Sequence, residues 1–261
     1  MNLAFVLLSE PRLPNAEDVV HSFSSFAAPD ESIQVAPDDG EETDDGEETA
    51  EGEILSLTLG SEGQAFVALV PMPVPDGEAD GAAEFSLSAL GTEWELPAHN
   101  AHLLVTLMSP DGASPVDEVS RFTSLLAAVA QSSDCVGIYW GEAGATHDPE
   151  FFITVAREPG VVPRIMVWSG VSVAREEDGR LSLLSLGMQQ LNLPNLLLVV
   201  SQSSENVALE TFFDLLSYVA NLGEALPDGD TVGRTADERL PVNYVESPID
   251  PEEKVWRVEL P

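Results

Sequence analysis

Apolar residues occur along the chain in short runs, separated by polar turns and by segments with helical spacing. The first run, Leu3 to Leu8, has no preceding basic residue and ends in a turn, which is typical of a strand and not of a signal peptide. Apolar spacing behind Asn15 predicts a short helix with Asn15 as its N-cap. Two further runs, 54–59 and 64–70, flank Gly60-Ser61-Glu62-Gly63, which predicts an antiparallel hairpin.

A helix predicted at 79–90 and a strand at 102–108 complete the first part of the chain. The resulting order is strand, helix, strand, strand, helix, strand, which is the order of a split βαβ, ferredoxin-like unit. A turn signal, Ser109-Pro110-Asp111-Gly112, follows. We therefore expect residues 1–112 to form an N-terminal α+β half.

The second part of the chain repeats much of this order. The elements that it predicts are a helix opened by Ser114-Pro115, a strand at 135–140, a helix after Asp148, a hairpin over 164–186, a strand at 196–200 and a helix over 205–222. We expect an α+β fold of two related ferredoxin-like halves, 1–112 and 113–225, with a mainly antiparallel sheet and helices packed on one face. Residues 226–261 are expected to be a proline-rich tail with an edge strand at 254–259.

Acidic residues dominate the charge of the chain. Forty-six acids against ten bases give a formal net charge of −36, which repels nucleic acid and anionic membranes and attracts cationic surfaces. The excess includes the segment 30–53, where the hexapeptide Asp-Asp-Gly-Glu-Glu-Thr occurs twice; it is expected to be a disordered acidic insertion. An acidic, lysine-poor composition is also typical of proteins from saline habitats, so the charge has two interpretations.

The single cysteine, Cys135, excludes a disulfide framework within the chain and is interpreted as a small buried side chain. No segment reaches the roughly 20 continuous apolar residues of a membrane span. A cytoplasmic location is expected.

The strand Cys135 to Trp140 and the run Ser185 to Leu196 resemble an uncharacterised bacterial family of domains of unknown function (DUF4261-like). In that family a glycine-methionine turn follows a strand and leads through a short apolar segment and a proline into another strand. The resemblance covers residues 103–222 and implies an α+β bacterial cytoplasmic domain with no settled activity. The family usually carries an acidic residue shortly after the proline, where this chain has Asn195.

The strongest cluster of candidate ligand-binding residues is the loop between a strand end and a helix start, with Trp140, Glu142, His147 and Glu150. His147 could act as a base or ligand, with Glu142 or Glu150 as its carboxylate partner. The alternative is structural, with Asp148 as N-cap and His147 as an exposed loop residue. The loop lacks a P-loop ending, and His99 and His102 would point to opposite faces of a strand. No catalytic set, metal site or cofactor site is indicated.

Three functions remain open. The favoured one is a non-enzymatic interaction or accessory protein, of the immunity, adaptor or secretion-associated type, whose acidic face binds a basic or oligomeric protein partner. The second is a DNA mimic that inhibits a nucleic-acid-binding protein by copying phosphate spacing. The third is an enzyme or small-ligand binder that uses the 140–150 loop. Neither direct nucleic-acid binding nor membrane binding is expected.

Overall fold

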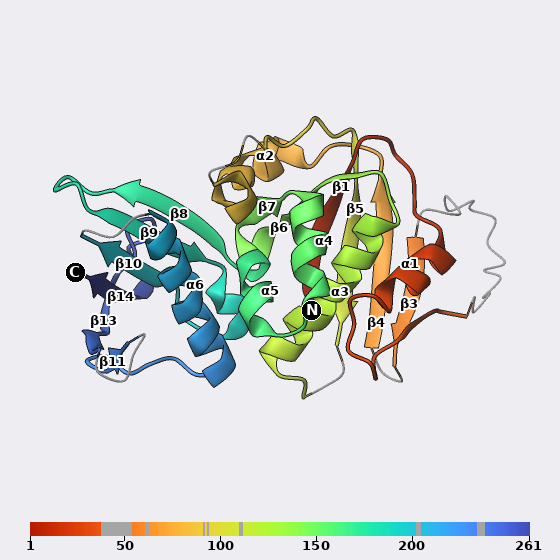
Figure 1. The fold of residues 1–261 in the computed structure, drawn as a ribbon. Coiled ribbons are helices and arrows are strands. Elements are labelled where there is room, and N and C mark those ends of the chain that lie inside the picture. The colour runs from red at the N-terminus through yellow and green to blue at the C-terminus, as the bar shows by residue number, and fades with distance from the viewer. Residues whose placement is uncertain are drawn as a thin grey trace.

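The computed structural model describes residues 1–37, 54–60, 63–90, 92, 94–109, 112–201, 205–233 and 238–261. These residues form a mixed α+β fold with six α-helices and two main sheets (Figure 1). All strand pairs within them are antiparallel except one, β10 with β14. The mainly antiparallel α+β class predicted from the sequence is therefore confirmed.

The first sheet has seven strands in the order β2-β3-β4-β5-β1-β6-β7. They are β1 (Asn2–Leu8), β2 (Ile33–Val35), β3 (Ile54–Leu59), β4 (Gly63–Val70), β5 (Ala101–Met108), β6 (Cys135–Trp140) and β7 (Ala145–His147). β1 lies inside the sheet, where Val6 faces Leu103 of β5 and Ile138 of β6. The predicted hairpin of β3 and β4 is confirmed.

β2 lies within the segment 30–53 that we expected to be disordered. It pairs with β3, and Ile33 is buried, so Ile33 supplies the apolar group that anchors this strand to the sheet. Residues 38–53, which hold the acidic repeat, lie outside the described residues.

The ferredoxin-like halves are not confirmed. A βαβ unit contains a parallel pair of strands joined across a helix. Each described pair of the first sheet is antiparallel, and β1 lies between β5 and β6.

Helices α1 (Ala16–Phe23), α3 (Pro115–Gln131) and α4 (Pro149–Arg157) cover one face of the first sheet (Figure 1). Alternate residues of β1, among them Val6, point to this face and enter the main core. α3 begins as predicted, because the Ser114 hydroxyl accepts a hydrogen bond from the Asp117 amide at 3.2 Å.

The opposite face is crossed by the connection between β4 and β5, residues 71–99, which we name the strap. Phe5 and Leu7 of β1 contact Val74 and Ala79 of the strap in an apolar cluster of its own. The helix predicted at 79–90 is broken into short pieces. They are η1 (Pro75–Gly77), α2 (Glu78–Ala82), η2 (Ala83–Phe85) and η3 (Leu87–Ala89). The break occurs at Ser86, which is extended and accepts the Ser88 amide hydrogen on its side chain.

The second sheet has the order β13-β14-β10-β9-β8 and is covered on one face by α6 (Glu205–Leu222) (Figure 1). Its strands are β8 (Gly170–Arg175), β9 (Leu181–Leu186), β10 (Leu196–Val200), β13 (Asn243–Glu246) and β14 (Lys254–Leu260). β11 (Thr231–Val232) and β12 (Leu240–Pro241) form a separate pair. The short helices η4 (Gly141–Ala143) and η5 (Met188–Leu191) complete the described elements.

Two local predictions in this part are wrong. The hairpin expected over 164–186 begins only at Gly170, because the preceding residues form helix α5 (Val161–Trp168). The strand expected at an edge of the sheet, β14, lies inside it, because it pairs with β10 on one side and with β13 on the other.

A continuous core joins both sheets and includes Val6, Phe122, Trp168 and Trp256. The division expected at residue 112 does not separate the sheets, because β6 and β7 return to the first sheet after α3. The tail expected from residue 226 contributes β13 and β14 to the second sheet. Among the described helices, none has the length and apolar character that a membrane crossing requires.

Candidate functional site

The loop that follows β6 contains the residues singled out from the sequence, and the structure separates them. The side chains of Trp140 and His147 are fully buried, whereas Glu142 and Glu150 are exposed. Trp140 contacts Phe122 edge-on in the core. Within the described residues, no hydrogen bond or ion pair joins either glutamate to His147. Asp148 caps α4 by accepting the Phe151 amide hydrogen at 3.0 Å, as the structural interpretation predicted.

His147 is not the exposed loop residue of that interpretation. Its Nε2 contacts the Val167 carbonyl oxygen at 3.1 Å, and its Nδ1 contacts the Ser86 hydroxyl at 2.8 Å. Burial lowers the pKa of His147 to about 4, an effect that the Val167 carbonyl partly offsets. The imidazole is therefore neutral at pH 7. A serine and a histidine in hydrogen-bonding contact resemble a nucleophile and its base, but both are 0 % exposed and closed to substrate.

Glu142, in the same loop, also has a shifted pKa. Desolvation raises its pKa, and the N-terminal amino group partly opposes the rise. Its backbone lies against the second sheet, because the Glu142 carbonyl and the Cα of Ala143 occupy the space where Gly187 would carry a Cβ. Gly170 likewise approaches the Ala143 carbonyl. The loop thus forms the joint between the two sheets.

The other histidines of interest, His99 of the strap and His102 of β5, both bind the backbone at the start of the strap. His99 Nε2 accepts the Val74 amide hydrogen at 3.2 Å, and His102 Nδ1 donates to the Met72 carbonyl at 2.8 Å. Among the described residues, no group of three or more His, Cys, Asp or Glu side chains could hold a metal ion. Burial raises the pKa of Cys135 to about 12, so its thiol stays protonated at neutral pH.

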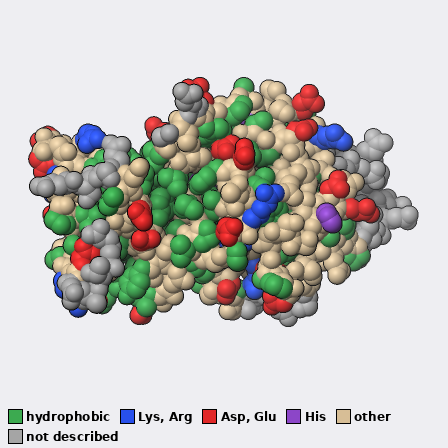
Figure 2. Space-filling view, in the orientation of Figure 1, with side chains coloured by type: hydrophobic (Ala, Val, Ile, Leu, Met, Phe, Trp, Pro, Cys, Tyr) green, Lys and Arg blue, Asp and Glu red, His purple; other side chains and the backbone are tan. Residues whose placement is uncertain are grey.

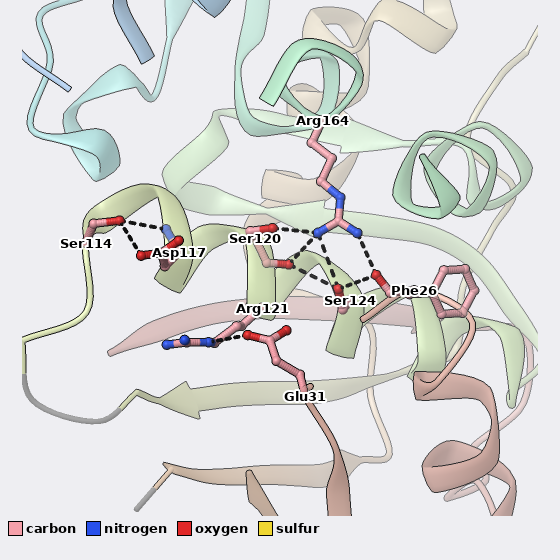
Figure 3. A network of polar contacts seen from close by, with 8 residues as sticks. All are labelled: Phe26, Glu31, Ser114, Asp117, Ser120, Arg121, Ser124 and Arg164. Carbon is pink, nitrogen blue, oxygen red and sulfur yellow. Dashed lines mark hydrogen bonds and ion pairs between the residues drawn. The ribbon is translucent and has the colours of Figure 1, made fainter. Parts of the chain in front are cut away.

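A buried arginine, Arg164 of α5, organises a polar network that the sequence analysis did not single out (Figure 3). Its guanidinium donates to the carbonyl oxygens of Phe26, Ala156 and Ser120 at 2.6 to 2.9 Å. It also donates to the hydroxyls of Ser120 and Ser124. Its hydrogen-bond partners are neutral, and burial lowers its pKa while Glu31 partly opposes the shift. The signal in the sequence was one arginine inside an apolar run.

Two surface hollows each contain several charged groups; a third, of about 260 Å³ beside α6, contains Asp214. One, of about 480 Å³, lies between the start of α1 and the end of α3, where Arg12 stands with Asp18 and Asp134. The other, of about 280 Å³, lies on the strap. We name it the Trp94 hollow; its lining includes Trp94, Asp80, Glu84 and Glu95. The charged groups in this lining are all acidic.

Residues 184–259 match a family model described as Domain of unknown function (DUF4261). The resemblance seen in the sequence is confirmed, with the match overlapping the expected region in residues 184–222. The matched segment holds half of β9, all of β10, α6 and β11 to β13, and most of β14, so it covers the second sheet without β8, together with its helix. Neither the curated proteins nor the solved structures contain a match to this chain.

Proposed function

We propose that this protein is a non-enzymatic interaction or accessory protein whose acidic surface binds a basic or oligomeric protein partner. The observation that carries the proposal is the charge. Ten bases cannot compensate 46 acids, so 36 carboxylates remain without a matching base. Such a field steers a cationic partner from a distance and raises its association rate.

The placement of the arginines supports this proposal. Arg164 is buried on neutral oxygens. Arg121 pairs with Glu31 at 2.6 Å, and Arg180 pairs with Asp178 at 2.7 Å. Arg164 is thus paired in the core, and Arg121 and Arg180 are paired with acids at the surface, so these three cations add little positive potential to the outer surface. Figure 2 shows acidic side chains scattered across one face of the molecule.

The Trp94 hollow offers a place for a basic side chain. An aromatic face attracts a Lys or Arg side chain, and an exposed interaction of this kind contributes about 0.5–1 kcal/mol. The carboxylates of Asp80, Glu84 and Glu95 line the same hollow. Together they favour a cation and disfavour an anionic ligand.

The experiment is affinity capture from the native host with the wild-type protein and two triple variants. One variant neutralises the hollow, Asp80→Asn, Glu84→Gln and Glu95→Gln. The matched control removes the same charge elsewhere, Glu210→Gln, Glu224→Gln and Glu246→Gln, at three exposed positions. We expect a basic or oligomeric protein whose capture weakens at high salt and falls further with the hollow variant than with the control.

A partner whose capture does not change with salt concentration would contradict the charge argument. If both variants lost the same amount of captured partner, the acidic surface as a whole would be the binding feature, and the hollow would have no special role. Turnover of a small molecule that Glu142→Gln abolishes would replace the proposal with the enzyme alternative.

A further inference from the structure

Two histidines bind the strap to the first sheet. His102 of β5 binds the Met72 carbonyl near the start of the strap, and His147 of β7 binds Ser86 in its middle. A third, His99, is the last residue of the strap and accepts from the Val74 amide near its start, so it holds the two ends of the strap together. We propose that the strap is a pH-sensitive flap, which mild acidification releases from the first sheet while the main core stays folded.

The hydrogen bond to His99 requires a neutral ring. A backbone amide only donates, so Nε2 of His99 must be unprotonated to accept from Val74. If Nε2 of His99 also carried a proton, its N–H would point at the N–H of Val74, and neither could accept. The side chain is 7 % exposed, so water has little access to replace the lost partner.

The bonds around His147 form a directed chain. The Asp148 amide donates to Ser88 Oγ at 3.1 Å, and Val167 at the other end offers a carbonyl oxygen that only accepts. Ser88 Oγ and Ser86 Oγ are 2.7 Å apart. With a neutral ring, each hydroxyl donates to the next group, ending at His147 Nδ1. Protonation of Nδ1 reverses this order and leaves the Ser88 hydroxyl hydrogen without its acceptor.

The first part of the strap contacts β1 through the small cluster of Leu7, Val74 and Ala79, which is separate from the large core. Further along the strap, Leu87 and Leu90 pack against the large core but are only partly buried. A segment held by a small apolar cluster, two partly buried side chains and a few hydrogen bonds can open as a local unit, at a lower free energy than global unfolding.

The charged and titratable groups of the strap and of the elements packed around it favour a protonated histidine once the strap opens. They are Asp76, Glu78, Asp80, Glu84 and Glu95 of the strap, Glu142 of η4, Asp148 before α4, Cys135 and Tyr139 of β6, and Arg175 of β8. β1 and β4, which lie on either side of β5, carry no charged residue. The acids outnumber the single arginine.

The direction of the effect follows from the folded state. Burial lowers the pKa of His147 to about 4 and also lowers that of His102, while an open strap returns them to their ordinary value of 6.5. Between these values the open form binds protons that the closed form does not. For His147 alone, going from pH 7.5 to pH 5 multiplies the open population by about 30-fold.

The test is hydrogen exchange of the whole protein at pH 7.5 and pH 5.0, corrected for the intrinsic pH dependence of amide exchange. Strap amides should lose protection by about 30-fold or more, while amides of α6 should lose much less. Unchanged strap protection, or an equal loss in α6, would overturn the proposal. This measurement uses the wild-type protein, so it tests the proposal even if substitution of a buried histidine prevents folding.

Two variants refine the result. His102→Gln keeps a donor for the Met72 carbonyl on a side chain that does not gain a proton, so it should reduce the pH response. His21→Gln alters the exposed histidine of α1 and should leave the response at the wild-type value. A His21→Gln protein that loses the response would contradict the assignment to the strap.

The effect of release on partner binding rests on the proposed function, because the Trp94 hollow lies on the strap. A deca-lysine peptide serves as the probe, with wild-type and Trp94→Ala protein compared at both pH values. The difference between the two proteins should be present at pH 7.5 and vanish at pH 5.0. A missing difference at pH 7.5 argues against the hollow and leaves the exchange result standing. A difference that persists at pH 5.0 beside an open strap shows that release does not regulate the hollow.

Discussion

Arg164 and Phe26 are 138 residues apart in the sequence, yet the Arg164 guanidinium donates to the Phe26 carbonyl oxygen at 2.6 Å (Figure 3). The same guanidinium binds Ser120 of α3 and Ala156 of α4. One side chain thus joins the segment after α1 to three helices. It supplies donors for buried carbonyls that no water can reach.

Arg164→Met should therefore destabilise the protein by about 3–5 kcal/mol, because it leaves several buried acceptors unpaired. Urea unfolding followed by circular dichroism measures the loss. Arg164→Lys should recover part of the stability, since an ammonium keeps the charge but not the planar set of donors. Arg12→Met, at an exposed position, is the control and should change stability by less than about 0.5 kcal/mol. A loss under about 1 kcal/mol for Arg164→Met would contradict the role given to this network.

Gly187→Ala should disturb the joint between the sheets. Gly187 has φ +86°, and an added Cβ would collide with the backbone of Glu142 and Ala143. Gly179 has the same φ but open space around it, so Gly179→Ala isolates the backbone cost of about 1 kcal/mol. We expect the melting temperature to fall much further for Gly187→Ala than for Gly179→Ala. Equal shifts would show that the close approach is unimportant.

Global stability should decrease on mild acidification. The pKa of His147 is about 4 when folded and 6.5 in its ordinary state. Its contribution is complete above pH 6.5 and is lost as the pH falls toward 4, by about 2 kcal/mol at pH 5. Urea unfolding at pH 7 and pH 5 measures the slope. His147→Gln should flatten it whatever its stability at pH 7, whereas a slope equal to that of the wild type would rule His147 out as the cause.

Salt should stabilise the fold. The net charge of −36 creates repulsion within the compact chain. Raising the ionic strength from about 0.01 M to 1 M shortens the Debye length from about 30 Å to about 3 Å. The melting temperature should rise across that NaCl series. A flat or falling curve would mean that the carboxylates are locally compensated or too far apart to repel.

Local signals predicted much of the fold. Ser114-Pro115 opened α3 as expected, and the run before Gly60 paired with the run after it, because capping and hairpin pairing depend on neighbours in the chain. The α5 segment was assigned to a strand because a short apolar run has no decisive period. Its helix is held by contacts of Arg164 with distant residues, which the sequence does not display. The pairing of β14 with β10 is equally non-local.

The site was harder to predict than the fold. From the sequence we expected His147, a histidine near a helix start, to be exposed. It is buried because the strap lies over it, and local spacing does not show that. His147 lies beneath Ser86, which is 61 residues away. The Trp94 hollow likewise needs Asp80 and Glu84 to lie beside Trp94. The sequence does show an aromatic residue, Trp94, between two acids, which is a signal for this hollow that we did not single out.

Of the four tryptophans, Trp140, Trp168 and Trp256 are at most 2 % exposed, whereas Trp94 is only partly buried. Three of the four indoles are thus shielded from solvent, so a collisional quencher such as acrylamide reaches mainly the fourth. The part of the wild-type protein's fluorescence that acrylamide quenches therefore reports on the strap, and movement there can be followed without a label.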